Sequence, residues 1–185
     1  MGEQHKKHSR REHLNDFHLN VAGEYVYDGA LYACQSSEEK QHRIKRAVWG
    51  MGAILIVAVI AGGCIPAPGM QNCFYVLLPY LGEFLGAASV IWALAKLGTD
   101  WSAVREYNYQ KSVAVLPVRT AVTAVFSGLG IVCELIFFFV NDHAGQTFFA
   151  LLYVLLKLTA LLSALVLRAE IMQAEWDKLP KKDNS

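Results

Sequence analysis

Three ionisable residues stand inside long apolar stretches of this sequence. Glu83 and Glu134 each occupy one stretch, and Lys157 lies in the middle of a third, 148–167. A charge near the centre of a membrane span costs at least about 2.5 kcal/mol, so opposite charges are expected to compensate one another there. Two carboxylates and one ammonium group could form a buried ion pair, or a site that binds or relays a proton or a small charged solute.

The position of each charge along its stretch indicates its depth. A helix rises about 1.5 Å per residue, which places Glu83 and Lys157 each about 14–15 Å from the same membrane boundary, and Glu134 about 10 Å from it. Glu83 and Lys157 therefore share one level near the midplane. Glu83 is the expected partner of Lys157, with Glu134 as the alternative. Such a pair could serve only to fix helix register, or it could belong to a binding site.

Polar and helix-bending residues surround these charges. The supporting residues of the candidate site are Pro79, Tyr80, Thr123, Ser127 and Tyr153. Helical spacing places the last three on the faces of Glu134 and Lys157, which indicates that those faces turn inward. Pro79 shares the face of Glu83 and, because it lacks an amide, leaves one carbonyl in the preceding turn unpaired.

Four apolar stretches are long enough to hold these residues within a membrane. They cover about residues 47–65, 74–97, 119–140 and 148–167 of a chain that is 54% hydrophobic. About 20 predominantly apolar residues in a helix cross the hydrocarbon core. The sequence therefore predicts an all-α membrane protein, built as a four-span antiparallel transmembrane helix bundle.

Capping and helix-breaking residues mark the ends of these helices. Ser36 and Glu39 have the spacing of a capping box, so the first helix is expected to begin there, well before its span. The prolines and glycine of 66–69 are expected to end it. Pro117 suits the first turn of the third helix, because the amide that it lacks would have no partner there.

The distribution of basic residues predicts the orientation. Apart from Lys157, every Lys and Arg lies before the first span, between 96 and 119, or from 168 onward. By the positive-inside tendency, both termini are cytoplasmic and the two short loops face outward. We expect a multi-pass protein of a bacterial cytoplasmic membrane. Its parts would be a tail (residues 1–35), the four-span bundle (36–182) and a short C-terminal end (183–185).

The tail, residues 1–35, is basic and contains several histidines and tyrosines. Its basic cluster at 6–11 suits contact with an anionic lipid surface. Val26 lies between two tyrosines, which favours a short extended segment. The tail histidines, with no cysteine among them and no repeated ligand spacing, do not predict a metal site. They are His5, His8, His13 and His18.

The four cysteines contain no C-x-x-C pair, which argues against a zinc ribbon or a thioredoxin-like redox centre. Cys64 and Cys73 bracket the predicted outer loop at 65–72. Both would lie on the oxidising face of the membrane, where a disulfide between them would join the first two spans. Whether it forms depends on the separation of the two Cα atoms.

The sequence lacks a recognisable catalytic constellation. Ser112, Glu106 and His143 are the candidates for nucleophile and base, and their spacing is typical of no known mechanism. We therefore expect no enzyme, no cofactor and no nucleic-acid partner.

Two function classes fit the remaining features. The first is an accessory or scaffolding subunit that contacts another membrane protein, or itself as a homo-oligomer. Its contacts would be the tyrosine-rich segments and the small-residue groove of Gly82 and Gly86. The alternative is a small proton-coupled or charged-solute carrier that uses Glu83, Glu134 and Lys157.

Overall fold

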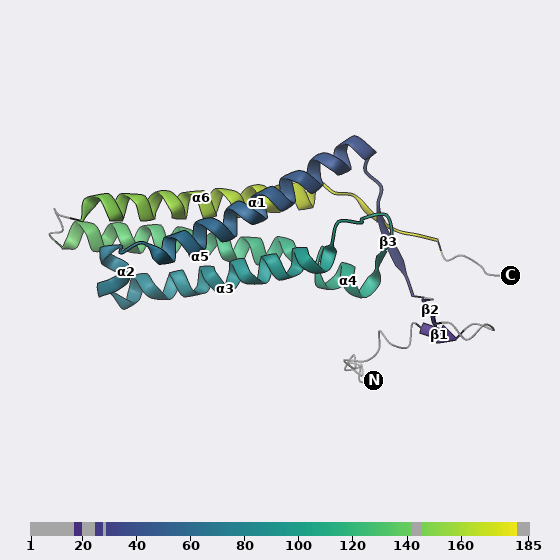
Figure 1. Ribbon diagram of the computed structural model, residues 1–185, viewed down its shortest axis with the longest axis horizontal. Coiled ribbons are helices and arrows are strands. Elements are labelled where there is room, and N and C mark those ends of the chain that lie inside the picture. Colours follow the sequence, from purple (N-terminus) through teal and green to yellow (C-terminus); the bar gives the residue numbers. More distant parts are fainter. Residues whose placement is uncertain (1–16, 20–24, 28, 142–145, 181–185) are drawn as a thin grey trace, which may run out of the picture.

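The computed structural model describes residues 17–19, 25–27, 29–141 and 146–180. Its long helices are α1 (Glu38–Cys64), α3 (Phe74–Leu97), α5 (Leu116–Val140) and α6 (Thr147–Met172). Each lies in a segment long and apolar enough to cross a membrane. Figure 1 shows them side by side in one elongated bundle. The predicted all-α four-span bundle is confirmed.

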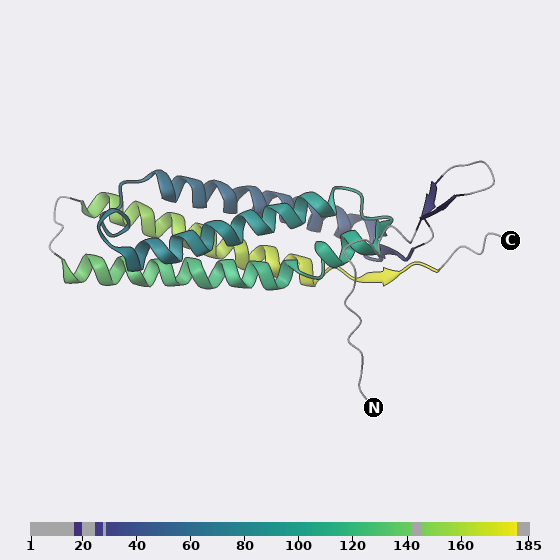
Figure 2. The ribbon, with the colours of Figure 1, turned by 90° about the horizontal axis from the view of Figure 1, so that it is seen from below.

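Every long helix contacts two neighbours that run in the opposite direction. Helices α1 and α5 both pack against α3 and α6, so the four helices enclose one interior. Figure 2 shows all four running along the length of the bundle. The helices alternate in direction along the chain, so each of these contacts is antiparallel. Side chains on the four inward faces therefore meet in a single core.

The helix ends agree with the predicted spans at some points and differ at others. Helix α3 has the predicted bounds, and Pro117 lies in the first turn of α5 as expected. Helix α6 continues to Met172 rather than ending at 167. The predicted capping box is wrong. Ser37 is the N-cap residue of α1, without a side-chain cap bond, and its carbonyl accepts the amide of Gln41 at 2.8 Å.

A small sheet lies at one end of the bundle, and we call this end the sheet end. Strand β3 (Leu31–Cys34) is central, and both β4 (Val104–Arg105) and β5 (Trp176–Lys178) pair with it in antiparallel register. The short helix α4 (Glu106–Lys111) follows β4 directly. The sequence prediction did not include this sheet, which ties part of the expected tail to the bundle.

The tail also contains two further strands. Strand β1 (Phe17–Leu19) pairs in antiparallel register with β2 (Tyr25–Tyr27). The extended segment predicted around Val26 is therefore confirmed. The basic cluster at 6–11 and three of the tail histidines lie outside the described residues, as do His143 and residues 183–185.

The opposite end, which we call the loop end, carries the short helix α2 (Pro68–Asn72) and the connection between α5 and α6. Helix α1 ends at Cys64, before the prolines, as predicted. The sequence prediction assigned Pro68 and Gly69 only the role of ending α1, whereas both lie within α2 and are buried.

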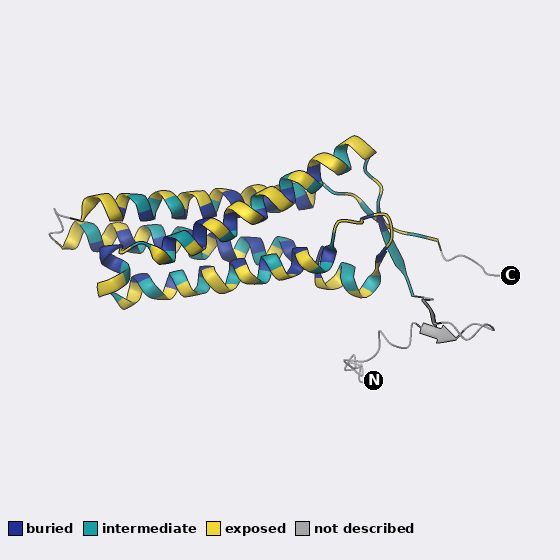
Figure 3. Cartoon of the chain, in the orientation of Figure 1, coloured by how far each residue is buried: buried dark blue, intermediate teal, exposed yellow. Residues whose placement is uncertain are grey.

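Burial follows the helix faces (Figure 3). Inward faces are buried, and outward faces expose large apolar side chains over much of the bundle's length. Examples are Val57, Leu85, Trp92, Val125, Leu151 and Leu162. A soluble monomer rarely exposes so continuous an apolar surface, whereas a lipid bilayer accommodates it. The chain is a membrane protein whose apolar helices face lipid.

The small-residue groove of α3 is filled from within the chain. A Cβ atom added at Gly82 would lie 2.6 Å from the ring of Phe126, and one added at Gly86 would lie 2.6 Å from Oγ1 of Thr123. Both neighbours belong to α5. The groove therefore lets α3 and α5 approach closely, and it is not the partner-binding surface that the sequence suggested.

Candidate functional site

Helices α3 and α6 bring Glu83 and Lys157 together in the bundle interior. The Lys157 ammonium donates a hydrogen bond to Oε2 of Glu83, and the Lys157 and Glu83 side chains are 2% and 0% exposed. This is the pairing that equal helical depth favoured. Removing two charges from water costs several kcal/mol per ion, so the pair depends on close contact and on further polar partners.

Two aromatic rings flank the Lys157 ammonium. Its nitrogen lies 4.5 Å from the centroid of the Tyr80 ring and 4.9 Å from that of Tyr153. Tyr153 lies one helical turn before Lys157, whereas Tyr80 comes from α3. Ring faces attract cations at these distances, most strongly when water is absent. The two tyrosine rings therefore stabilise the positive charge of Lys157 in addition to Glu83.

Ser127 supplies a second hydrogen bond to Glu83. Its Oγ lies 2.7 Å from Oε1 of Glu83 and 3.0 Å from the carbonyl oxygen of Thr123. A hydroxyl has a single proton to donate, and a charged acceptor forms the stronger bond. We therefore assign the donated bond to Glu83. Both carboxylate oxygens of Glu83 are then satisfied, one from α6 and one from α5.

Glu134 lies in the same interior, closer to the loop end, and is fully buried. The amide nitrogen of Gly69 in α2 is 3.4 Å from its Oε1. Lys157 is close enough to interact electrostatically with Glu134 as well as with Glu83. The stem of Lys157 passes Gly130, which lies on α5 one turn before Glu134. The three predicted charges thus form one cluster, in which Glu83 pairs directly with Lys157.

Gly69 is a site residue that the sequence prediction missed. A Cβ atom there would overlap Oε2 of Glu134 and would lie 3.1 Å from the ring of Phe137. Only a residue without a side chain lets this amide approach the carboxylate so closely. The signal in the sequence was a Pro-Gly pair, which is also typical of an ordinary helix end.

The remaining predicted residues have separate roles. Pro79 is buried inside α3, one turn before Glu83. The Oγ1 of Thr123 donates to the carbonyl oxygen of Arg119 at 2.8 Å, and Thr123 contacts Gly86 rather than the charges. Cys64 and Cys73 carry free thiols in this structure, so the disulfide stays a prediction.

Of the three enzyme candidates, the structure describes Ser112 and Glu106, and each makes a local hydrogen bond. The hydroxyl of Ser112 donates to the carbonyl oxygen of Asn108, and Glu106 accepts a bond from Gln110 at 3.2 Å. Within the described ranges, no group of three His, Cys, Asp or Glu side chains could hold a metal ion.

An aromatic cluster, which the sequence prediction also missed, lies at the sheet end. The rings of Trp101 and Trp176 are 5.4 Å apart, and Tyr109 lies 5.8 Å from Trp176. The Tyr32 ring stacks on Tyr109 at 4.2 Å, with an interplanar angle of 5°. The backbone carbonyl of Trp101 accepts the amide of Cys34 at 3.1 Å. This cluster joins β3, β5, α4 and the segment after α3 into one unit.

The turn that carries Trp101 is held by its neighbours. Ser102 donates to Oδ1 of Asp100 from its hydroxyl at 2.7 Å and from its amide at 3.0 Å. These two bonds favour the charged carboxylate and keep the pKa of Asp100 below its usual value. The two hydrogen bonds therefore stabilise the turn fully when the pH is above the pKa that Asp100 has in the unfolded chain. This stabilisation is lost as the pH falls through the lower pKa that Asp100 has in the folded chain.

No family model matches the chain, and no curated protein or solved structure matches it.

Proposed function

We propose that this protein is a non-enzymatic accessory or scaffolding subunit that contacts another membrane protein through its sheet end. The observation that supports this proposal most directly is the convergence of three separate segments there. Strand β3 precedes the first span, β4 and α4 lie between the second and third, and β5 follows the fourth. A bundle needs only short connections, so an ordered unit outside the spans has a use beyond joining helices.

The buried ion pair is consistent with a structural role. Lys157 and Glu83 are closed off from solvent by their own helices and by two tyrosine rings. A buried pair specifies the arrangement of helices more reliably than it stabilises them. In this proposal the pair fixes the register of α3 against α6, and the bundle holds the sheet end in a defined position.

The orientation belongs to the same proposal: the sheet end is cytoplasmic and the loop end faces outward. A membrane-impermeant maleimide, applied to intact cells, should label Cys64 and Cys73 at the loop end but not Cys34 in β3. If the predicted disulfide forms, labelling of the loop-end pair will require prior reduction. Labelling of Cys34 without permeabilisation would contradict the orientation. Full labelling of Cys64 and Cys73 without reductant would exclude the bridge.

Replacing Ala33 by proline tests the proposed contact. Ala33 is buried in the central strand β3 opposite Asp177, where proline removes an amide from the ladder. The variant should still insert as a bundle but should lose any stoichiometric partner that crosslinks to the wild-type chain in native membranes. Ala103→Pro, at an exposed bend before β4, is the control and should keep the partner. A partner retained by Ala33→Pro would refute the proposal.

A carrier is the second candidate, and one arrangement favours it. Glu134 adds a second buried carboxylate within electrostatic reach of Lys157. The buried Tyr153 hydroxyl beside them makes no hydrogen bond within the described part of the chain. Glu134→Gln separates the two functions, because it removes a charge while nearly preserving shape. Partner crosslinking should survive this change in a subunit, whereas proton or solute uptake into proteoliposomes should be abolished in a carrier.

A further inference from the structure

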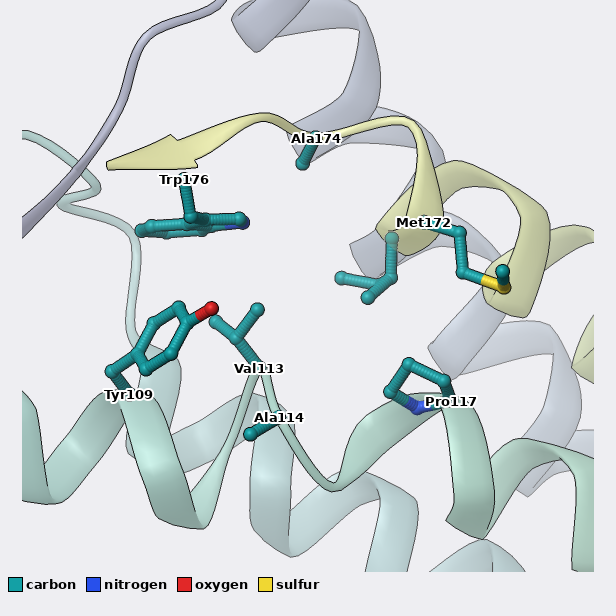
Figure 4. Close-up of a pocket in the computed structure, with 8 residues that line it drawn as sticks. Tyr109, Val113, Ala114, Pro117, Met172, Ala174 and Trp176 are labelled. Atoms are coloured by element: carbon teal, nitrogen blue, oxygen red, sulfur yellow. The ribbon is translucent and has the colours of Figure 1, made fainter. Parts of the chain in front are cut away.

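A cavity of about 380 Å³ lies where the bundle meets the sheet end. Its walls come from the start of α5, the end of α6, α4 and β5, and include Tyr109, Pro117, Met172 and Trp176 (Figure 4). The volume falls within the range of small-molecule binding sites. Met172, one of the lining residues and the last residue of α6, is 62% exposed. The cavity therefore lies at the level where the apolar surface of the bundle ends.

The side chains that line the cavity are mostly apolar, but polar atoms form the larger share of the surface exposed to it. In Figure 4 the hydroxyl of Tyr109 and the nitrogen-bearing end of the Trp176 ring both point toward the cavity. The indole Nε1 of Trp176 is buried and makes no hydrogen bond within the described residues. An indole N–H can only donate. A ligand that fits these walls combines an apolar portion with hydrogen-bond acceptors.

A positive charge lies next to Pro117, on a residue that is not itself part of the cavity lining. The guanidinium of Arg168 donates to the carbonyl oxygen of Pro117 at 2.7 Å, and Arg168 is half-buried. That single bond uses one of five guanidinium donors. Lys111, the last residue of α4, is exposed at the same end of the bundle. The charge here suits a phosphate group, which arginine binds well.

From these observations we infer that the cavity binds an anionic phospholipid of the leaflet at the sheet end. The glycerol region and first methylene groups would lie against Pro117 and Met172. The phosphate would accept hydrogen bonds from Arg168, Trp176 and Tyr109. A bilayer surrounds these helices, so lipid is present at high local concentration at this level. Tryptophan, tyrosine and arginine are also the residues that anchor proteins at lipid headgroups. This inference does not depend on the proposed subunit function.

The apolar side chain of a partner protein could fill the same cavity, but two observations favour lipid. The lining residue Met172 is exposed on the outer surface of the bundle, and the charge on the nearby Arg168 complements a phosphate. A free phosphate ion would satisfy Arg168 but would leave the apolar side chains of Val113, Ile171 and Met172 uncovered. The experiment must therefore distinguish an anionic lipid from a neutral lipid and from a free ion.

Thermal unfolding of the purified protein in mild detergent tests the inference. Dioleoylphosphatidylglycerol should raise the midpoint of unfolding at lower concentration than dioleoylphosphatidylcholine, and inorganic phosphate should have no effect. Arg168→Gln keeps a donor for Pro117 but removes the charge. It should raise the phosphatidylglycerol concentration for half-maximal stabilisation roughly tenfold, as expected for one charge-assisted hydrogen bond.

Filling the cavity should abolish the selective response. Ala114→Phe and Ala174→Leu enlarge side chains on opposite walls, and both variants should respond equally to the two lipids. Ala169→Phe, an exposed α6 residue outside the cavity, is the matched control and should respond like the wild type. Equal stabilisation of the wild type by both lipids would overturn the inference. So would an unchanged selective response in both filling variants, or an equal effect of inorganic phosphate.

Discussion

Lys157→Met alone and Glu83→Leu alone are each expected to lower the free energy of unfolding by about 3–5 kcal/mol. Each substitution leaves one charge in the bundle interior without its partner, and the side chains are no more than 2% exposed. The double variant replaces both charges by apolar groups of similar size, which can be nearly neutral. It should therefore recover much of the stability that either single change removes, and the recovered part measures the coupling of the pair.

The measurement is thermal unfolding in detergent, monitored as the fraction of protein that stays folded after heating. Leu158→Met changes the neighbouring residue on the exposed face of α6 and serves as the control, with a change within about 0.5 kcal/mol. A double variant no more stable than the worse single would contradict the direct pairing. The same cycle with Glu134 would then show whether the second carboxylate carries the charge compensation.

The four helical spans, and the equal depth of Glu83 and Lys157 along them, were predictable because both follow from simple geometry. Helical rise fixes depth along a span, so residue spacing alone places Glu83 and Lys157 at one level. The inward faces also followed from spacing, and Thr120, Thr123, Ser127 and Glu134 are all buried on one stripe of α5. Long, strongly apolar segments leave few alternative arrangements in lipid.

The sheet end was not predictable for a different reason. Its strands have only two to four residues, too few to show an alternating pattern. They also come from three distant parts of the chain. Their pairing depends on where the ends of α1, α3 and α6 place them, which a local pattern does not record. Gly69 was missed on similar grounds, since its amide meets Glu134 across 65 sequence positions.

The ion pair and the sheet end depend on different features of the same helices. An ion pair at the midplane needs α3 and α6 in a fixed register, and the sheet end needs the same helices to end at fixed positions. Close packing of α3 against α5 serves both, because Ser127 of α5 donates to Glu83 of α3. A change that separates these two helices should therefore disturb the charged core as well as the local contact.

Gly86→Ala is expected to produce that separation. The added Cβ atom would lie 2.6 Å from Oγ1 of Thr123 and 3.3 Å from its Cα atom. The side chain of Thr123 can rotate only by giving up its bond to the carbonyl of Arg119, and the backbone atom cannot move alone. Overpacking of this kind costs about 1–3 kcal/mol. Gly86→Ala should therefore lower the unfolding midpoint, although alanine is the better helix former.

Gly128→Ala is the matched control, because it makes the same substitution in a long helix where a Cβ atom would meet nothing within 4 Å. It should be neutral or stabilising by up to about 1 kcal/mol, the ordinary preference for alanine within a helix. Equal effects of the two substitutions would contradict the close approach of α3 and α5. If the approach also holds Ser127 on Glu83, Gly86→Ala should reduce the coupling measured between Lys157 and Glu83, whereas Gly128→Ala should leave it unchanged.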